Sequence, residues 1–122
     1  MKRIDEELLN TKVENGSLRI VFKTNKPVGR LAFELKDEEL VRRTISDIAR
    51  ESYTHEVMEI IVVIGTEKDD TFFPRPIRET VTTSRHMESA IRTTIIYAKQ
   101  MADLRRETDL KERFATLAKH IY

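Results

Sequence analysis

The residues best suited to chemistry lie between positions 72 and 99, where five cations stand against two acids and give a net charge of +3. Arginine forks, hydroxyl donors and the free N–H groups at a helix start all bind anions, and a phenylalanine can stack on a base. This composition predicts a site for a phosphate-bearing ligand at the start of a helix. Its candidate residues are Phe72, Phe73, Arg75, Arg78, Thr82, Thr83, Ser84, Arg85 and Arg92.

The same residues also have ordinary structural interpretations. Threonine and serine before a helix are common caps, adjacent phenylalanines can close the end of a sheet, and arginines are usually solvated. The chain has no Walker loop and no GxGxxG fingerprint. Binding of a nucleotide, a cyclic nucleotide or single-stranded nucleic acid is therefore the alternative prediction and not the leading one.

Three histidines, His55, His86 and His120, are the remaining candidates for chemistry. His55 and His86 could act as general base and acid of a phosphodiesterase or nuclease, with an arginine stabilising the developing charge. The chain has no HExxH motif and no two histidines one helical turn apart. Solvated histidines are the commoner explanation, so the sequence predicts no catalytic residue, no metal site and no cofactor, and leans away from an enzyme.

Composition narrows the class of protein further. The 122 residues suit one domain, 1–122, with 39% hydrophobic and 35% charged residues and a net charge of +1. The charge balance argues against generic duplex DNA binding, and the absence of cysteine excludes disulfides and thiolate zinc sites. The longest apolar run, 60–64, is far too short to span a membrane, so we expect a soluble protein in the cytoplasm.

The first half of the chain predicts an α+β fold. Apolar residues alternate with polar ones over 8–14, 17–24 and 30–36, and the turn residues Asn15-Gly16 and 25–29 separate these segments. Asp37 resembles the cap of a helix that ends near Tyr53, and 57–64 is a β-branched run typical of a buried strand. We therefore expect an antiparallel β-meander of about four strands in the order β-β-β-α-β.

The second half predicts a long loop followed by helix. Residues 67–83 contain a polar tetrad, 67–70, and two prolines, which disfavour both helix and central strand. Thr83 or Ser84 caps a helical region, 84–122, which carries two apolar stripes out of phase by roughly 140° at 100° per residue. The stripes are Met87, Ile91, Ile95, Ala98 and Ala102, and then Leu110, Phe114, Leu117, Ala118 and Ile121. Both a helical hairpin and one long bent helix fit this pattern.

The leading functional hypothesis comes from a helix that is apolar on more than one side. Ile96 and Tyr97 point away from the first stripe, and a helix of this kind is sandwiched in its own fold or buried in an oligomer. The predicted oligomer interface consists of Ile96, Tyr97, Met101 and Leu104. The sequence thus favours a homo-oligomeric regulatory or assembly protein, with another protein or a small anionic ligand as further partners and no membrane contact.

Overall fold

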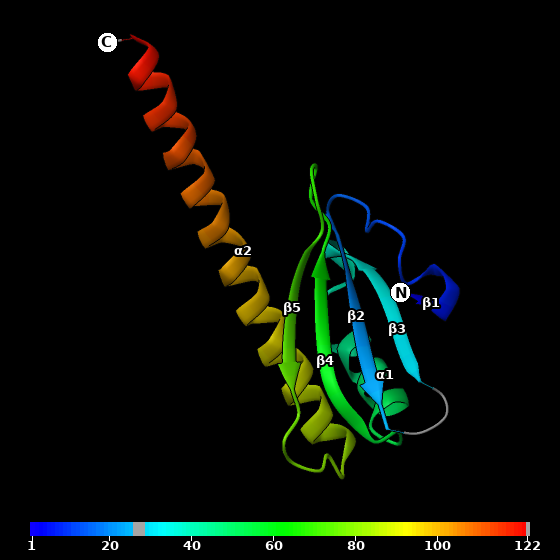
Figure 1. Cartoon of the computed structure of the whole chain (residues 1–122). Helices are drawn as coiled ribbons and strands as arrows, with labels where there is room; N and C mark the ends of the chain where they lie inside the picture. Colours follow the sequence, from blue (N-terminus) through cyan, green and yellow to red (C-terminus); the bar gives the residue numbers. More distant parts are fainter. Residues whose placement is uncertain (26–28, 122) are drawn as a thin grey trace.

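A computed structural model shows a five-stranded antiparallel sheet followed by a long C-terminal helix (Figure 1). It describes the backbone of residues 1–25 and 29–121, and the side chains among these except 109, 110, 113 and 116–121. The strands are β1 (Lys2–Ile4), β2 (Ser17–Thr24), β3 (Arg30–Lys36), β4 (Val57–Ile64) and β5 (Thr71–Pro76). The helices are α1 (Arg42–Ser52) and α2 (Ser84–Ile121), with short 3-10 turns η1 (Glu6–Leu8) and η2 (Asp37–Glu39). The α+β class and the antiparallel sheet are confirmed.

One face of the sheet and both helices enclose the main core. The spatial order β1-β3-β2-β4-β5 places the longest apolar strands, β2 and β4, side by side. On the face that meets α1 and the first half of α2, the middle of both strands is buried, as with Ile20 and Phe22 of β2 and Ile60 and Val62 of β4, each with no exposed surface. The predicted stripe of α2 is confirmed, because Met87, Ile91 and Ala98 have no exposed surface. This packing fixes the first half of α2 across the sheet.

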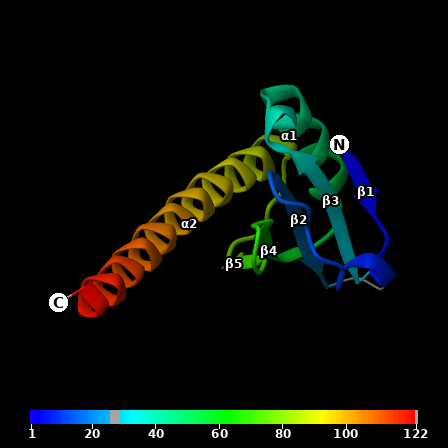
Figure 2. The same cartoon turned by 90° about the horizontal axis from the view of Figure 1, so that it is seen from above.

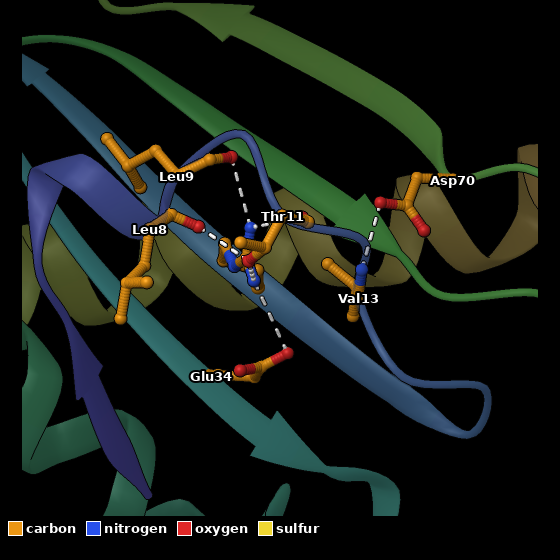
Figure 3. Close-up of polar contacts among 7 residues, drawn as sticks. Leu8, Leu9, Thr11, Val13, Glu34 and Asp70 are labelled. Carbon is orange, nitrogen blue, oxygen red and sulfur yellow. Dashed lines mark hydrogen bonds and ion pairs between the residues drawn. The ribbon is translucent and has the colours of Figure 1, made fainter.

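The N-terminal segment covers the opposite face of the sheet, where Ile4, Val21 and Ala32 form a second buried cluster. Arg19 lies on this face, is only 3% exposed, and holds the covering segment by hydrogen bonds. Its guanidinium donates to the carbonyl oxygens of Leu9 (3.1 Å) and Thr11 (2.9 Å), and its Nη2 lies 3.6 Å from Glu34 (Figure 3). A buried arginine therefore ties residues 9–11 to the sheet.

The predicted first strand, 8–14, was wrong. The first strand is β1, which pairs with β3, and residues 9–14 form no strand. Their backbone groups are bound by side chains instead, as when the Val13 N–H donates to Asp70 Oδ2 at 3.0 Å (Figure 3). The turn at Asn15-Gly16 does form, with Gly16 at φ 84°, while the second predicted turn at 25–29 lies partly outside the described residues. Alternation of apolar residues was thus no proof of strand pairing.

Two further boundaries differ from the sequence predictions. Asp37 begins η2 and not a long helix; α1 begins only at Arg42, after an extended Val41. The segment 67–83, predicted as loop, contains β5 at the edge of the sheet. The Ile77 N–H points to β4 and donates to the Met58 carbonyl oxygen at 2.7 Å. Because backbone N–H groups alternate along a strand, the nitrogen atoms of Pro74 and Pro76 point to the free edge of the sheet, where no donor is needed.

The C-terminal region is one continuous helix and not a hairpin. Thr83 caps it, since its Oγ1 accepts a hydrogen bond from the His86 N–H at 3.2 Å. After Ala102, α2 extends beyond the sheet, and its C-terminal end lies away from every other element (Figures 1 and 2). From Asp103 onward, every side chain that the structure describes is exposed.

Candidate functional site

The two phenylalanines predicted to bind a ligand point to opposite faces of β5. Phe72 is exposed, whereas Phe73 is buried in the main core. The Arg105 guanidinium lies over the Phe73 ring, with Cζ 5.1 Å from the centroid. Phe73 therefore serves packing, and only Phe72 could stack on a ligand.

Three of the seven predicted polar residues, Arg75, Thr83 and Arg92, make contacts within the chain. Arg75 donates from Nη1 to the Ala90 carbonyl oxygen (3.1 Å) and to Thr94 Oγ1 (3.3 Å), which joins β5 to α2. Arg92 forms an ion pair with Glu88 at 2.7 Å and lines a different part of the surface. Thr83 is used as the helix cap. The residues predicted to bind one ligand therefore do not all lie at one site.

What remains is a hollow of about 470 Å³ between the segment after β5 and the first three turns of α2. We call it the arginine hollow. Of the nine predicted ligand residues, which are all described, only Arg75 and Arg78 line it. The other lining residues are Pro76, Ile77, Glu79, Thr80, Val81, His86, Ser89, Ala90 and Thr93. Sequence reasoning missed Ser89 and Thr93, although their spacing from His86 places them on one side of a helix.

The two candidate catalytic histidines do not share a site. His86 lines the arginine hollow, while His55 lines a neighbouring hollow of about 410 Å³. Residues 77–81 form a wall common to both hollows and lie between the imidazoles. No cluster of three or more His, Asp or Glu side chains suited to a metal ion occurs among the described residues. This arrangement gives no support to paired acid–base chemistry by His55 and His86.

The acidic tetrad 67–70 is bound to the N-terminal segment. The Lys12 ammonium donates to the carbonyl oxygens of Glu67 (3.3 Å) and Lys68 (2.7 Å). Asp70 accepts from the Val13 N–H, while its second oxygen, Oδ1, is buried without a hydrogen-bond partner. The tetrad is therefore an anchor for residues 12–13.

The second candidate surface is the outer face of α2. Ile96 (53%), Tyr97 (55%), Leu104 (56%) and Phe114 (76%) are its exposed large apolar side chains. At 100° per residue they occupy one sector of about 100°, opposite the buried face of α2. We call this set the outer stripe. Its spread over 18 residues corresponds to about 27 Å of helix.

The predicted oligomer interface only partly coincides with the outer stripe. Ile96, Tyr97 and Leu104 belong to it, whereas Met101 is partly buried and packs against the main core. Of the second stripe predicted from sequence, Phe114 is exposed; Leu110, Leu117, Ala118 and Ile121 lie outside the described side chains. Sequence spacing nevertheless places Leu110, Phe114, Leu117 and Ile121 at alternating steps of four and three, the repeat of a helix-pairing seam.

Comparison with protein-family models, with curated proteins and with solved structures found no match. Within the part of the chain that the structure describes, no helix combines the length and the apolar character needed to cross a bilayer.

Proposed function

We propose that the protein is a cytoplasmic interaction module that assembles with copies of itself, and that the outer stripe of α2 forms the contact. One observation carries the proposal. The C-terminal part of α2 extends beyond the sheet (Figure 1). Every described side chain from Asp103 onward is exposed, including Leu104 and Phe114. Large apolar side chains of this kind are usually covered by a partner.

The energetics of an isolated helix favour such a partner. The projecting segment 103–121 is about 28 Å long; each of its side chains that the structure describes is exposed, and the Arg105 guanidinium contacts Phe73. A helix is expensive to nucleate, and in water its stability comes chiefly from packing of an apolar face. Pairing along the outer stripe would provide this packing and would withdraw Leu104 and Phe114 from water.

The charges of the projecting segment favour a second copy as the partner. Residues 103–121 contain four acids and five Lys or Arg residues, and the two signs are interspersed. Two such helices do not repel each other strongly, and side chains of opposite sign can pair across the contact. In a symmetric dimer, the commonest class of homo-oligomer, the outer stripe of each copy would be covered by that of the other.

Sedimentation equilibrium of the full chain tests the proposal. We expect a defined oligomer whose dissociation constant lies in the micromolar range, which corresponds to roughly 8 kcal/mol of association free energy. Phe114→Lys should raise the dissociation constant at least about tenfold, because it places a charge in the apolar contact. The control is Glu112→Lys, which introduces the same residue about 200° around the helix.

Two results would count against self-assembly. The first is a chain that stays monomeric up to about 0.5 mM. A dissociation constant above this concentration corresponds to an association free energy weaker than about 4.5 kcal/mol, too weak for a specific oligomer. Equal effects of Phe114→Lys and Glu112→Lys would show that the outer stripe is not the contact. Thermal melts of both variants check that the fold is intact.

The arginine hollow supports a second candidate function, the binding of a phosphate-bearing ligand. The specific observation is that Arg78, Thr80 and His86 line one hollow beside the first turn of α2. Arg78 supplies a cationic donor, and the hydroxyls of Thr80 and Ser89 supply neutral donors suited to a phosphate, whereas the Thr93 hydroxyl donates to the Ser89 carbonyl oxygen at 2.8 Å. Glu79 is the only acid among the residues that line it.

Native mass spectrometry with a panel of nucleotides and cyclic nucleotides tests this candidate. The expected result is one added ligand mass per chain, which Arg78→Ala removes. Arg85→Ala serves as the control, because Arg85 lies on the same first turn of α2 and does not line the hollow. Binding that is lost equally in both variants would point to general charge attraction, and absence of any added mass would reject the candidate.

A further inference from the structure

A further apolar surface lies between α1 and α2 and shares no lining residue with the arginine hollow. It is a groove of about 550 Å³. We call it the basic groove. It is lined by Leu40, Arg42, Ile45, Arg92, Ile95, Ile96 and Lys99. Its floor is aliphatic, and its charged residues are three cations and no acid.

The cations of the basic groove are available to a ligand. Arg92 pairs with Glu88 at 2.7 Å and Lys99 pairs with Asp37 at 3.3 Å, but the side chains of Arg92, Lys99 and Asp37 are each about half exposed or more. The Lys99–Asp37 pair is exposed on both sides and contributes little net free energy, so Lys99 can turn to a new carboxylate at low cost. Glu88 is only 21% exposed, but the Arg92 guanidinium has five N–H donors and can accept a second carboxylate while it keeps this partner. Arg42, which is exposed, has no acidic partner among the described residues.

The spacing of the cations defines the shape of the partner. Arg92 and Lys99 are seven residues apart on α2, which is two turns or about 10 Å, and Arg42 comes from α1 on the other side. Ile95 and Ile96 lie between the two α2 cations along the helix. A helix with acids flanking an aliphatic stripe matches this pattern, because its i, i+7 carboxylates have the same separation.

We propose that the basic groove binds an acidic amphipathic helix of a partner protein. The aliphatic stripe of that helix would lie on Leu40, Ile45 and Ile95, and its flanking carboxylates would pair with Arg42 and with Arg92 and Lys99. Charge complementarity gives orientation and fast association, and burial of the aliphatic floor gives affinity. This role adds a hetero-partner to the proposed self-association; the two surfaces share Ile96, and the other residues of the groove lie outside the outer stripe.

The experiment uses the full chain and a fluorescein-labelled 18-residue peptide made of leucine, glutamate and alanine. Leucines recur at steps of three and four to form one stripe, with glutamates flanking it. We expect saturable binding by fluorescence anisotropy that weakens when NaCl rises from 50 to 500 mM. Two control peptides complete the set: one with every glutamate replaced by glutamine, and one with the same composition in scrambled order.

The chain offers a closely matched pair of variants. Arg42→Glu reverses a charge in the basic groove and should weaken peptide binding at least about tenfold. Arg43→Glu makes the same change at the next residue of α1, which is exposed and does not line the groove, and should change binding less than about twofold. Lys99→Glu should reproduce the loss from the α2 side. Melting curves show whether each variant is folded.

Several outcomes would overturn the inference. The first is that the glutamine peptide or the scrambled peptide binds as tightly as the glutamate peptide. The second is that Arg42→Glu and Arg43→Glu weaken peptide binding equally, and the third is that the glutamate peptide does not bind. Selective binding to phosphatidylserine vesicles without peptide binding would assign the basic groove to a lipid surface instead. Sensitivity of self-association to Arg42→Glu would assign it to a second copy. Phe114→Lys should leave peptide binding intact, which separates a failure of this inference from a failure of the proposed self-assembly.

Discussion

At the scale of single residues, Arg19 has the most demanding environment in the molecule. It is 3% exposed, and its guanidinium binds two carbonyl oxygens and the Thr11 hydroxyl and lies near Glu34, while its Nε has no hydrogen-bond partner. A buried charge is tolerated only when hydrogen bonds replace its hydration. The polar attachment of residues 9–11 to the sheet therefore comes from this side chain, beside the apolar packing of Leu9 on the second buried cluster.

Arg19→Met should lower the free energy of unfolding by about 2–4 kcal/mol, because the carbonyl groups of residues 9 and 11 lose a charged donor. Lys23→Met is the control on the same strand; Lys23 is exposed and lies 3.9 Å from Glu59, so its loss should cost less than about 0.5 kcal/mol. Urea denaturation gives both values. Hydrogen exchange should also speed up in residues 9–14 of the Arg19 variant, and unchanged exchange there would contradict the anchoring role.

Glu39 links stability to pH. The backbone N–H of Lys36, at 3.0 Å, lowers the pKa of the Glu39 carboxyl from its ordinary value of about 4.5, and the terminal ammonium of Met1 adds to this effect. A pKa that is lower in the folded state means that the carboxylate stabilises the fold above about pH 4.5. That contribution is lost as the pH falls through the folded-state pKa.

Glu39→Gln should therefore lower the melting temperature slightly at pH 7 and have little effect near pH 2, where the wild-type carboxyl is also protonated. Differential scanning calorimetry at both values measures the difference. Glu38→Gln, at an exposed neighbouring residue, is the control and should not change with pH in this way. A loss that is equal at both pH values would mean that the ionised carboxylate is not what stabilises η2.

At the scale of elements, the sequence predicted the strands that have a clear residue pattern of their own. It did not predict the strands that form because they pair with residues far away in the sequence. β2, β3 and β4 are fully apolar on one face, so alternation and β-branching indicated them within the bounds observed. β1 is three residues long and exists because it pairs with β3, about 30 residues away. The prolines of β5 concealed an edge strand, because nothing local shows which backbone groups will face a neighbour.

The candidate sites follow the same rule. The exposed residues of the outer stripe were indicated by helical periodicity, since Ile96 and Tyr97 cannot share a face with Met87 and Ile91. Arg75, by contrast, looked like a ligand-binding residue, and its contacts to Ala90 and Thr94 come from the docking of α2 on β5. The partner of a surface arginine is decided by tertiary packing, which composition and spacing do not reveal.

Gly65 shows how tightly two elements can approach each other. A Cβ at this position would lie 2.2 Å from the carbonyl oxygen of Glu14 and 2.7 Å from that of Val13, so the N-terminal segment crosses directly over the end of β4. Gly65→Ala should cost about 1–3 kcal/mol, because a backbone segment has to move. At Gly16, a Cβ would meet nothing within 4 Å, and only φ +84° matters.

Gly16→Asn is therefore the matched control, since asparagine tolerates a left-handed conformation, and its cost should stay below about 1 kcal/mol. Chemical denaturation measures the free energy of unfolding of both variants. It compares the need for space at Gly65 with the need for a positive φ at Gly16. A Gly65→Ala variant as stable as wild type would show that residues 13–14 are free to shift away from β4.

At the scale of the whole molecule, a compact sheet-and-helix body carries a helix that continues well beyond it (Figure 2). The two parts should differ in stability, because the body has a core of buried side chains on α1, α2 and the sheet, whereas every described side chain from Asp103 onward is exposed. Self-association would couple them, since the projecting helix would become stable only in the oligomer.

Helix content should therefore depend on protein concentration. Below the dissociation constant, the end of α2 should fray, because the described side chains from Asp103 onward are exposed and a helical segment that lacks a packed apolar face is only marginally stable in water. Far-UV circular dichroism between about 1 and 200 µM should show the helical signal rising along the same curve as the oligomer fraction from sedimentation. Phe114→Lys should keep the low-concentration signal throughout, and Glu112→Lys should follow the wild type. If the helical signal of the wild type were constant while the oligomer fraction changed, α2 would be stable by itself and the copies would meet through another surface.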